Sequence, residues 1–226
     1  RVKIKNDSIF GNQIYTNWDL FELLGVDDPP PGSDWTLDLD YLSDRGLATG
    51  TAYKYRGENL WLPGPYFGFI DIWGIQDDGF DNLGLGRRHI EPDKDYRYRF
   101  LGRHRQELPD DLRLTKELGW ISDRNFLEQY YENEWDEFKD QTTGVLLEQV
   151  RDNWSWNLAV DTRLNTFFTQ TEWLPRFDHF WLGQPLLGDW LTWYEHSQAG
   201  YGKLRIASRP TDPEDLANFA YMPWEV

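Results

Sequence analysis

The chain has 226 residues, enough for one sizeable all-β unit, and its formal net charge of −16 argues against nucleic acid, whose phosphates it would repel. Cysteine is absent, which excludes a disulfide framework and thiol chemistry. No apolar run approaches the ~20 residues that a membrane-spanning helix needs. Aromatic residues make up 17% of the chain, and Trp and Tyr are typical both of membrane interfaces and of sugar-stacking surfaces.

Period-two alternation predicts strands throughout the N-terminal half. A first strand is expected over 12–24 and ends before the Pro- and Gly-rich segment 29–32, which cannot donate to a ladder. The clearest strand follows at 35–41. A hairpin turn at 43–46 leads to a strand containing Tyr53, Lys54 and Tyr55, and another strand is expected at 66–75.

The middle of the chain alternates between long polar segments and strands. Residues 77–95 are acidic and aperiodic, so we expect a long exposed loop there, followed by a strand from 96 to about 105. The stretch 112–164 then reads as strand, excursion, strand, tight turn and strand. Its excursion, 122–141, is expected to be a short helix or ordered loop, with Ser122 as the candidate N-cap.

The last predicted strands run from 154 to about 168, from 172 to 185 and from 190 to 205, with loop and one helical turn over 206–226. From Tyr66 onward, short connections fall at one end and most long ones at the other, as in outer-membrane barrels. We therefore predict an all-β, antiparallel up-and-down meander of about ten strands, part of an incomplete transmembrane β-barrel seen as a curved open sheet. Residues 1–226 would form a single unit, and a start at Arg1 rather than Met favours an excerpt of a longer protein.

The alternation gives the sheet one apolar face and one charged face, and the apolar face needs either a second sheet or lipid to cover it. If lipid covers it, the lipid-facing residues are Trp35, Leu37, Leu39, Tyr41, Trp154, Trp156, Leu158 and Val160. The lumen-facing residues are then Asp38, Asp40, Lys54, Arg97, Arg99, Asn157, Asp161 and Arg163. Arg97 and Arg99 are the candidates to meet phosphates, because guanidinium forks match phosphate oxygens. The alternative for them is pairing with lumen acids such as Asp38 or Glu117.

The sequence contains neither an HExxH metal-binding motif nor a GxSxG nucleophile elbow. The four histidines are scattered without metal-ligand spacing, so no metal or other cofactor is predicted. Asp38 and Asp40 could serve as glycosidase acids, but such partners normally face each other across a cleft, which favours solvated or lumen-facing acids instead. Asp77, Asp78 and Asp81 lack the spacing of a Ca²⁺ loop and are expected to be a solvated charge run.

Several segments resemble the lipopolysaccharide-assembly outer-membrane protein family LptD, also called OstA or the organic solvent tolerance protein. Ile121-Ser122-Asp123, with the aromatic-rich residues up to Tyr131, is similar to a family strand that ends in Val/Ile-Ser-Asp. Trp173–Phe177 resembles the family's Leu-Pro strand start, and Asp189–Gly200 resembles the strand that follows. The likeness covers residues 12–205, which would be interior barrel strands. The family's N-terminal jellyroll and its cysteines have no counterpart here.

The resemblance implies transport without catalysis at the cell outer membrane. The barrel would insert lipopolysaccharide into the outer leaflet, with a plug lipoprotein similar to LptE inside it. A periplasmic bridge similar to LptA would deliver the lipid through an N-terminal domain outside this sequence. Membrane lipid would surround the strands. Two other readings stay open: a soluble aromatic-rich β-sandwich that binds carbohydrate, and a β-rich glycan hydrolase using acids of the Asp38 and Asp40 type.

Overall fold

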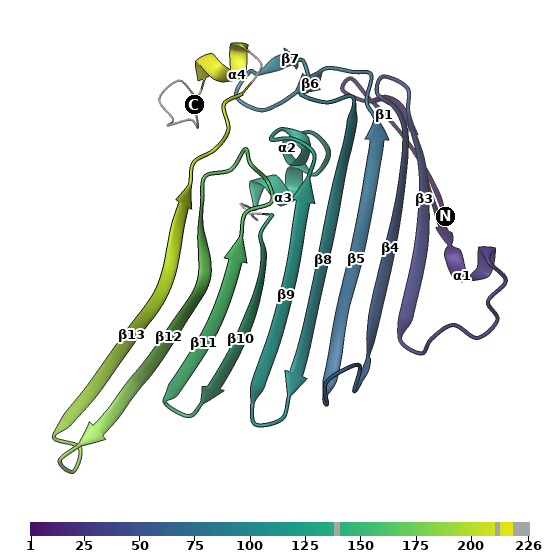
Figure 1. The fold of residues 1–226 in the computed structure, drawn as a ribbon. Coiled ribbons are helices and arrows are strands. Elements are labelled where there is room, and N and C mark those ends of the chain that lie inside the picture. Colours follow the sequence, from purple (N-terminus) through teal and green to yellow (C-terminus); the bar gives the residue numbers. More distant parts are fainter. Residues whose placement is uncertain (138–140, 211–212, 219–226) are drawn as a thin grey trace.

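Eleven antiparallel strands follow one another in chain order across one curved sheet (Figure 1). This is a computed structural model, and it describes residues 1–137, 141–210 and 213–218. The strands are β1 (Val2–Asp7), β2 (Gly11–Asp19), β3 (Ser33–Leu42), β4 (Gly46–Glu58), β5 (Pro65–Gln76), β8 (Tyr96–Leu108), β9 (Leu112–Ile121), β10 (Thr143–Arg151), β11 (Trp154–Thr162), β12 (Gln170–Leu186) and β13 (Leu191–Arg205). The all-β meander is confirmed. Within the described residues β1 and β13 do not pair with each other, so the sheet is open.

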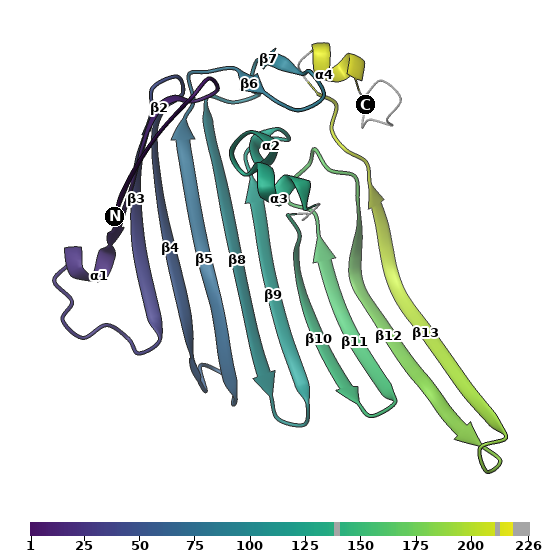
Figure 2. The same ribbon diagram turned by 180° about the vertical axis from the view of Figure 1, so that it is seen from behind.

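The two ends of the sheet differ in their connections (Figures 1 and 2). At one end, here called the turn end, β8–β9, β10–β11 and β12–β13 are joined by residues 109–111, 152–153 and 187–190. At the other, the loop end, 77–95 contains β6 (Asp81–Asn82) and β7 (Arg88–Ile90), which pair as a small separate sheet. The β9–β10 connection at the loop end contains α2 (Phe126–Tyr130) and α3 (Glu132–Asp136). The predicted sorting of short and long connections from Tyr66 onward is therefore present.

Several predicted boundaries were wrong for local reasons. β2 ends at Asp19, because its carboxylate accepts a hydrogen bond from the Glu22 N–H and caps α1 (Leu20–Leu23). The strand predicted to reach residue 168 ends at Thr162, just after a bulge between Ala159 and Asp161. β1 was not predicted at all. It pairs along β2 and is exposed at every residue, and its alternation is confined to Val2 and Ile4 against Lys3 and Lys5, a short signal that the prediction overlooked.

The excursion after β9 is helical, as expected, but Ser122 does not cap it. Asn125 precedes α2 without a side-chain capping bond, and the Ser122 hydroxyl instead donates to Asp123. α4 (Pro213–Asn218) supplies a helical turn after β13, while 138–140, 211–212 and 219–226 lie outside the described residues. In the described part of the chain, no helix has the length and apolar character to cross a membrane.

Buried apolar side chains gather at the loop end of the sheet. One cluster contains Leu42, Ala48 and Ile75 from β3, β4 and β5. The other contains Ile121 from β9 together with Phe126 and Leu127 of α2. Trp73 and Tyr130 pack against both clusters and join them. The hydrophobic core therefore lies where α2 packs against one face of the sheet, and not between two sheets.

Candidate functional site: two opposed faces and a buried charge network

One face of the sheet carries α2 and α3, and we call it the helix-covered face. Trp73 of β5 lies 5.2 Å from the Tyr130 ring, measured between ring centroids. The Arg99 guanidinium of β8 lies 3.7 Å above the Tyr131 ring and forms an ion pair with Glu134 of α3 at 2.7 Å. Directly paired residues of antiparallel strands point to the same side, so the register extends this face from strand to strand.

The opposite face, here called the apolar face, is almost free of charge on β3–β5 and β8–β11, whereas on β12 and β13 it carries His179 and Glu195, whose side chains lie 2.7 Å apart. One row across it consists of Leu37, Thr51, Ile72, Phe100 and Trp120. In β3–β5 and β8–β11, all of whose residues the structure describes, every Asp and Glu lies on the helix-covered face. The only basic side chains on the apolar face of these strands are His104, Lys116 and Arg151. The charge separation is therefore nearly complete in these seven strands.

Large side chains of the apolar face remain in contact with solvent. Leu39 is 51% exposed, Trp120 47% and Leu158 38%. Within the described chain the only other sheet is the β6–β7 pair, so no second sheet covers these residues. An exposed apolar area of this extent marks a surface that meets either a membrane or another protein.

Aromatic rings on the apolar face form two groups, one near each end of the strands. Toward the loop end lie Tyr41, Tyr96, Tyr98 and Trp120, and the Tyr98 and Trp120 rings meet edge to face at 5.2 Å. Toward the turn end lie Trp35, Tyr53, Tyr55, Tyr66, Trp154, Trp156 and Trp181. Ring contacts connect the first four of these without a break. Aliphatic side chains such as Ile70, Leu118, Val145 and Val160 fill the band between the two groups.

The helix-covered face is lined by charges that pair with one another. Arg103 of β8 binds Glu117 of β9 at 2.9 Å, and Arg113 bridges Glu107 and Glu148 at 3.1 Å each. All of these side chains are partly exposed, so this part of the face is wet. Ion pairs of this exposure stabilise little individually.

The structure places the two predicted residue sets on opposite faces. Those expected to face lipid, Trp35, Leu37, Leu39, Tyr41, Trp154, Trp156, Leu158 and Val160, all lie on the apolar face. Of those expected to face a lumen, Asp38, Asp40, Lys54, Arg97, Arg99, Asn157 and Asp161 lie on the helix-covered face. Arg163 lies beyond the end of β11, and its guanidinium donates to the carbonyls of Thr166, Phe168 and Ile206. It therefore stabilises a loop rather than lining a strand.

Asp40 and Asp38, the acids considered for glycosidase chemistry, are held within the sheet. Asp40 is buried and accepts hydrogen bonds from the Trp73 indole and the Thr16 N–H, both at 3.1 Å. Asp38 accepts one from the Asn17 amide at 2.7 Å. Both acids come from one strand, so they do not form a pair across a cleft.

Arg97 is the centre of a buried charge network that joins three segments. Its five N–H groups contact Asp123 at 2.8 and 2.9 Å, Asp81 at 2.5 and 3.2 Å, and Asp77 at 3.0 Å. Arg45, from the β3–β4 turn, pairs with Asp77 at 3.1 Å and Asp81 at 3.4 Å. All five side chains are at most 2% exposed. Every donor of the Arg97 guanidinium is thus used.

This network corrects three predictions. The segment 77–95 is not simply an exposed loop, because Leu83 and Ile90 are buried together with Asp77 and Asp81. Asp77 and Asp81 are not a solvated run, and the charges they meet are arginines. Neither Arg97 nor Arg99 is free to meet a phosphate from solution, because Arg99 pairs with Asp71 and Glu134 at 2.7 Å each. The pairing alternative was the better one, although the partners are not Asp38 or Glu117.

Burial controls the ionisation of the loop-end groups. Desolvation raises the pKa of Asp81 above its ordinary value, although Arg97 and Arg45 oppose the shift. Burial also raises the pKa of the Tyr130 phenol, which donates to Asp77 at 2.6 Å, and that of the Tyr131 phenol. The neutral phenols and the paired carboxylates together hold α2 against the sheet. We call the assembly of 77–95 with α2 and α3 the cap.

No cluster of three or more acidic or histidine side chains suited to a metal ion occurs among the described residues. Neither the comparison with protein-family models nor the comparison with curated proteins found a match. The chemistry of the two faces must therefore carry the functional argument.

Proposed function

We propose that this chain is part of an outer-membrane β-barrel translocon of the LptD type, which inserts lipopolysaccharide into the outer leaflet. The observation that carries the proposal is the segregation of charge. The strands keep every carboxylate of β3–β5 and β8–β11 on one side and expose aliphatic residues between two aromatic groups on the other. Transmembrane barrels have an outward apolar band about 25 Å tall, flanked by aromatic girdles, and a polar interior.

In this proposal the apolar face contacts hydrocarbon and the helix-covered face lines a water-filled passage. The turn end would then face the periplasm and the loop end the exterior, because outer-membrane barrels have short periplasmic turns and long outer loops. The unpaired edges of β1 and β13 need further strands, since an open edge cannot remain in lipid. Those strands could come from the same longer chain.

The resemblance to LptD supplies the cargo and the partners of the proposal. The Ile-Ser-Asp segment that carries the likeness ends β9, and its Asp123 anchors Arg97 in the cap. The polar face below the cap would pass the sugar and phosphate head of lipopolysaccharide while the acyl chains leave sideways into the membrane. An LptE-like lipoprotein and an LptA-like bridge would complete the pathway.

Single-cysteine scanning tests the membrane half of the proposal cleanly, because the chain contains no cysteine of its own. A nitroxide label at residues 37–40 and 156–159 of the full chain in vesicles is exposed in turn to oxygen and to a water-soluble nickel chelate. We expect labels at Leu39 and Leu158 to be relaxed mainly by oxygen, and labels at Asp38 and Asn157 mainly by the nickel chelate. Equal access of the chelate on both faces would contradict a membrane location.

Photo-crosslinking tests the transport half. A photoreactive residue replacing Lys54, exposed on the helix-covered face, is expected to capture lipopolysaccharide in living cells. The same residue at Leu39 serves as the matched control on the other face. Capture of no lipopolysaccharide at Lys54, in a protein that the nitroxide scan places in the membrane, would leave a barrel with a different cargo.

A further inference from the structure

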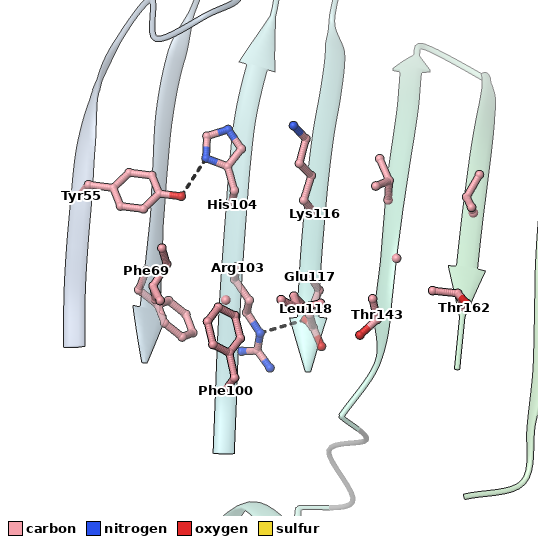
Figure 3. A pocket seen from close by; sticks show the side chains of 15 residues that line it. Tyr55, Phe69, Phe100, Arg103, His104, Lys116, Glu117, Leu118, Thr143 and Thr162 are labelled. Carbon is pink, nitrogen blue, oxygen red and sulfur yellow. Dashed lines mark hydrogen bonds and ion pairs between the residues drawn. The ribbon is translucent and has the colours of Figure 1, made fainter. Parts of the chain in front are cut away.

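The apolar face carries a groove whose position and lining differ from the rest of the band. It has a volume of about 400 Å³ and runs between β5, β8, β9 and β10 (Figure 3). Gly102 lies at its centre, paired with Ile70 on one side and Leu118 on the other. Because Gly102 has no side chain among these larger neighbours, a depression forms that is open to the surroundings of the sheet.

The groove is apolar at one end and basic at the other. Phe100, Ile70 and Leu118 form the apolar part, while His104 and Lys116 are paired across β8 and β9 toward the turn end. The His104 Nδ1 lies 3.1 Å from the Tyr55 hydroxyl. Figure 3 shows the Lys116 side chain running along β9 away from Leu118, toward the turn end.

Within the part of the chain that the structure describes, Lys116 is a cation without an acidic partner. Its ammonium lies 6.0 Å from the Trp61 ring centroid, and no carboxylate of the described residues forms an ion pair with it. The apolar face of the surrounding strands contains no Asp or Glu at all. Long basic side chains extend from apolar surroundings toward the interface in this way, and they attract lipid phosphates there.

We propose that this groove binds one glycerophospholipid, with an acyl chain over Gly102 and the phosphate at Lys116. The charge complementarity selects the occupant, because a phosphate supplies the negative charge that the face lacks, and the aliphatic lining fits a hydrocarbon chain. The His104–Tyr55 pair would contact the glycerol region, since it lies beside Lys116 on the same face. The inference rests on the proposed membrane location and adds a lipid site on the outside of the barrel, separate from any cargo inside it.

Native mass spectrometry of the full chain in detergent tests the site with three probes: phosphatidylglycerol, phosphatidylethanolamine and diacylglycerol. Lys116→Gln is expected to weaken retention of the two phospholipids about five- to ten-fold and to leave diacylglycerol unchanged. Gly102→Leu is expected to weaken all three, because a Cβ there meets its nearest heavy atom, on the Phe100 ring, at 3.5 Å and the rest of the side chain enters the groove. Lys203→Gln, at an exposed lysine near the loop end of β13, is the charge-matched control.

Insertion into vesicles, measured in parallel for every variant, separates this inference from the proposed function. If all variants insert and Lys116→Gln retains phospholipid as well as Lys203→Gln does, the lipid site is refuted and the membrane location stands. If the unaltered chain fails to insert, the proposed function is refuted, and the lipid site that rests on it is refuted as well.

Discussion

Replacing Arg97 by Met should open the cap while leaving the sheet paired. The substitution removes the one guanidinium that contacts Asp77, Asp81 and Asp123 together, and all four side chains are at most 2% exposed. Breaking a buried ion pair by removing one partner costs about 3–5 kcal/mol, because the remaining charge is left without compensation. Arg45 still pairs with Asp77 and Asp81, but Asp123 would lose its arginine partner in the network.

A cost of this size makes local opening more frequent by a factor of roughly 10² to several 10³. Hydrogen exchange should therefore accelerate by that factor over 77–95 and α2, and remain slow in β4 and β9. Arg105→Met is the matched control, because its ion pair with Glu107 at 2.8 Å involves side chains 38% and 40% exposed. Such a pair stabilises by at most about 1 kcal/mol.

The pH dependence of hydrogen exchange in the cap is a second test of Arg97→Met. Burial raises the pKa of Asp81, and removing Arg97 takes away one of the two arginines that oppose this. A carboxyl group whose pKa is raised on folding stabilises the folded state at low pH. This stabilisation is lost as the pH rises through the pKa of the folded state. The opened cap should thus regain protection on acidification, and Asp81→Asn should partly rescue Arg97→Met at neutral pH. If exchange in 77–95 is unchanged by Arg97→Met, the network does not hold the cap and the reasoning is refuted.

Leu158→Arg should cost about 2–4 kcal/mol of stability in vesicles if the apolar face meets lipid. Asn157→Arg, on the other face between Glu148 and Asp178, should be tolerated. Equal denaturation midpoints for the two variants would contradict this. Tyr130→Phe removes the hydrogen bond to Asp77 and should cost about 1.5–3 kcal/mol of cap protection. Because burial raises the pKa of Tyr130, the unaltered cap should lose protection as the pH rises above about 10, and hydrogen exchange should show a weaker alkaline loss in the variant. Gly46→Ala should lower the denaturation midpoint more than Gly25→Ala, since both have positive φ but only the Gly46 Cβ would meet the Gln76 carbonyl oxygen; similar midpoints would show that this contact is relieved without cost.

The sheet could be predicted because its information is local. Alternation over Trp35–Tyr41 or Trp154–Val160 places each residue on a face without knowledge of the partner strand, and the register then brings the two predicted sets, apart from Arg163, to opposite sides. Strand ends were less predictable. Asp19 ends β2 by accepting a hydrogen bond from the N–H three residues on, which caps a helix, whereas the bulge after Ala159 lies in the pairing of β11 with β12, which the sequence of β11 alone does not show.

The cap could not be predicted in the same way, since its partners are distant in the chain. Arg45 sits in a hairpin turn, where sequence alone indicates solvent, yet it reaches Asp81 36 positions later. Arg97 alternates with tyrosines like any strand residue and gives no local sign that three carboxylates surround it. The only sequence signal for the buried network is an acidic, non-periodic segment followed by a strand with alternating arginines. The same pattern fits a solvated loop equally well.

Mean hydropathy misleads for this chain because it averages over the two faces. A value of −0.73 and a charge of −16 suit a soluble protein, but the carboxylates of β3–β5 and β8–β11 are confined to one side of the sheet. A hydrophobic surface can therefore coexist with an acidic composition, provided that the polar side faces water. The same separation makes Lys116 conspicuous: on the acidic side it would be one of many paired cations, and on the apolar side no carboxylate of the described residues forms an ion pair with it.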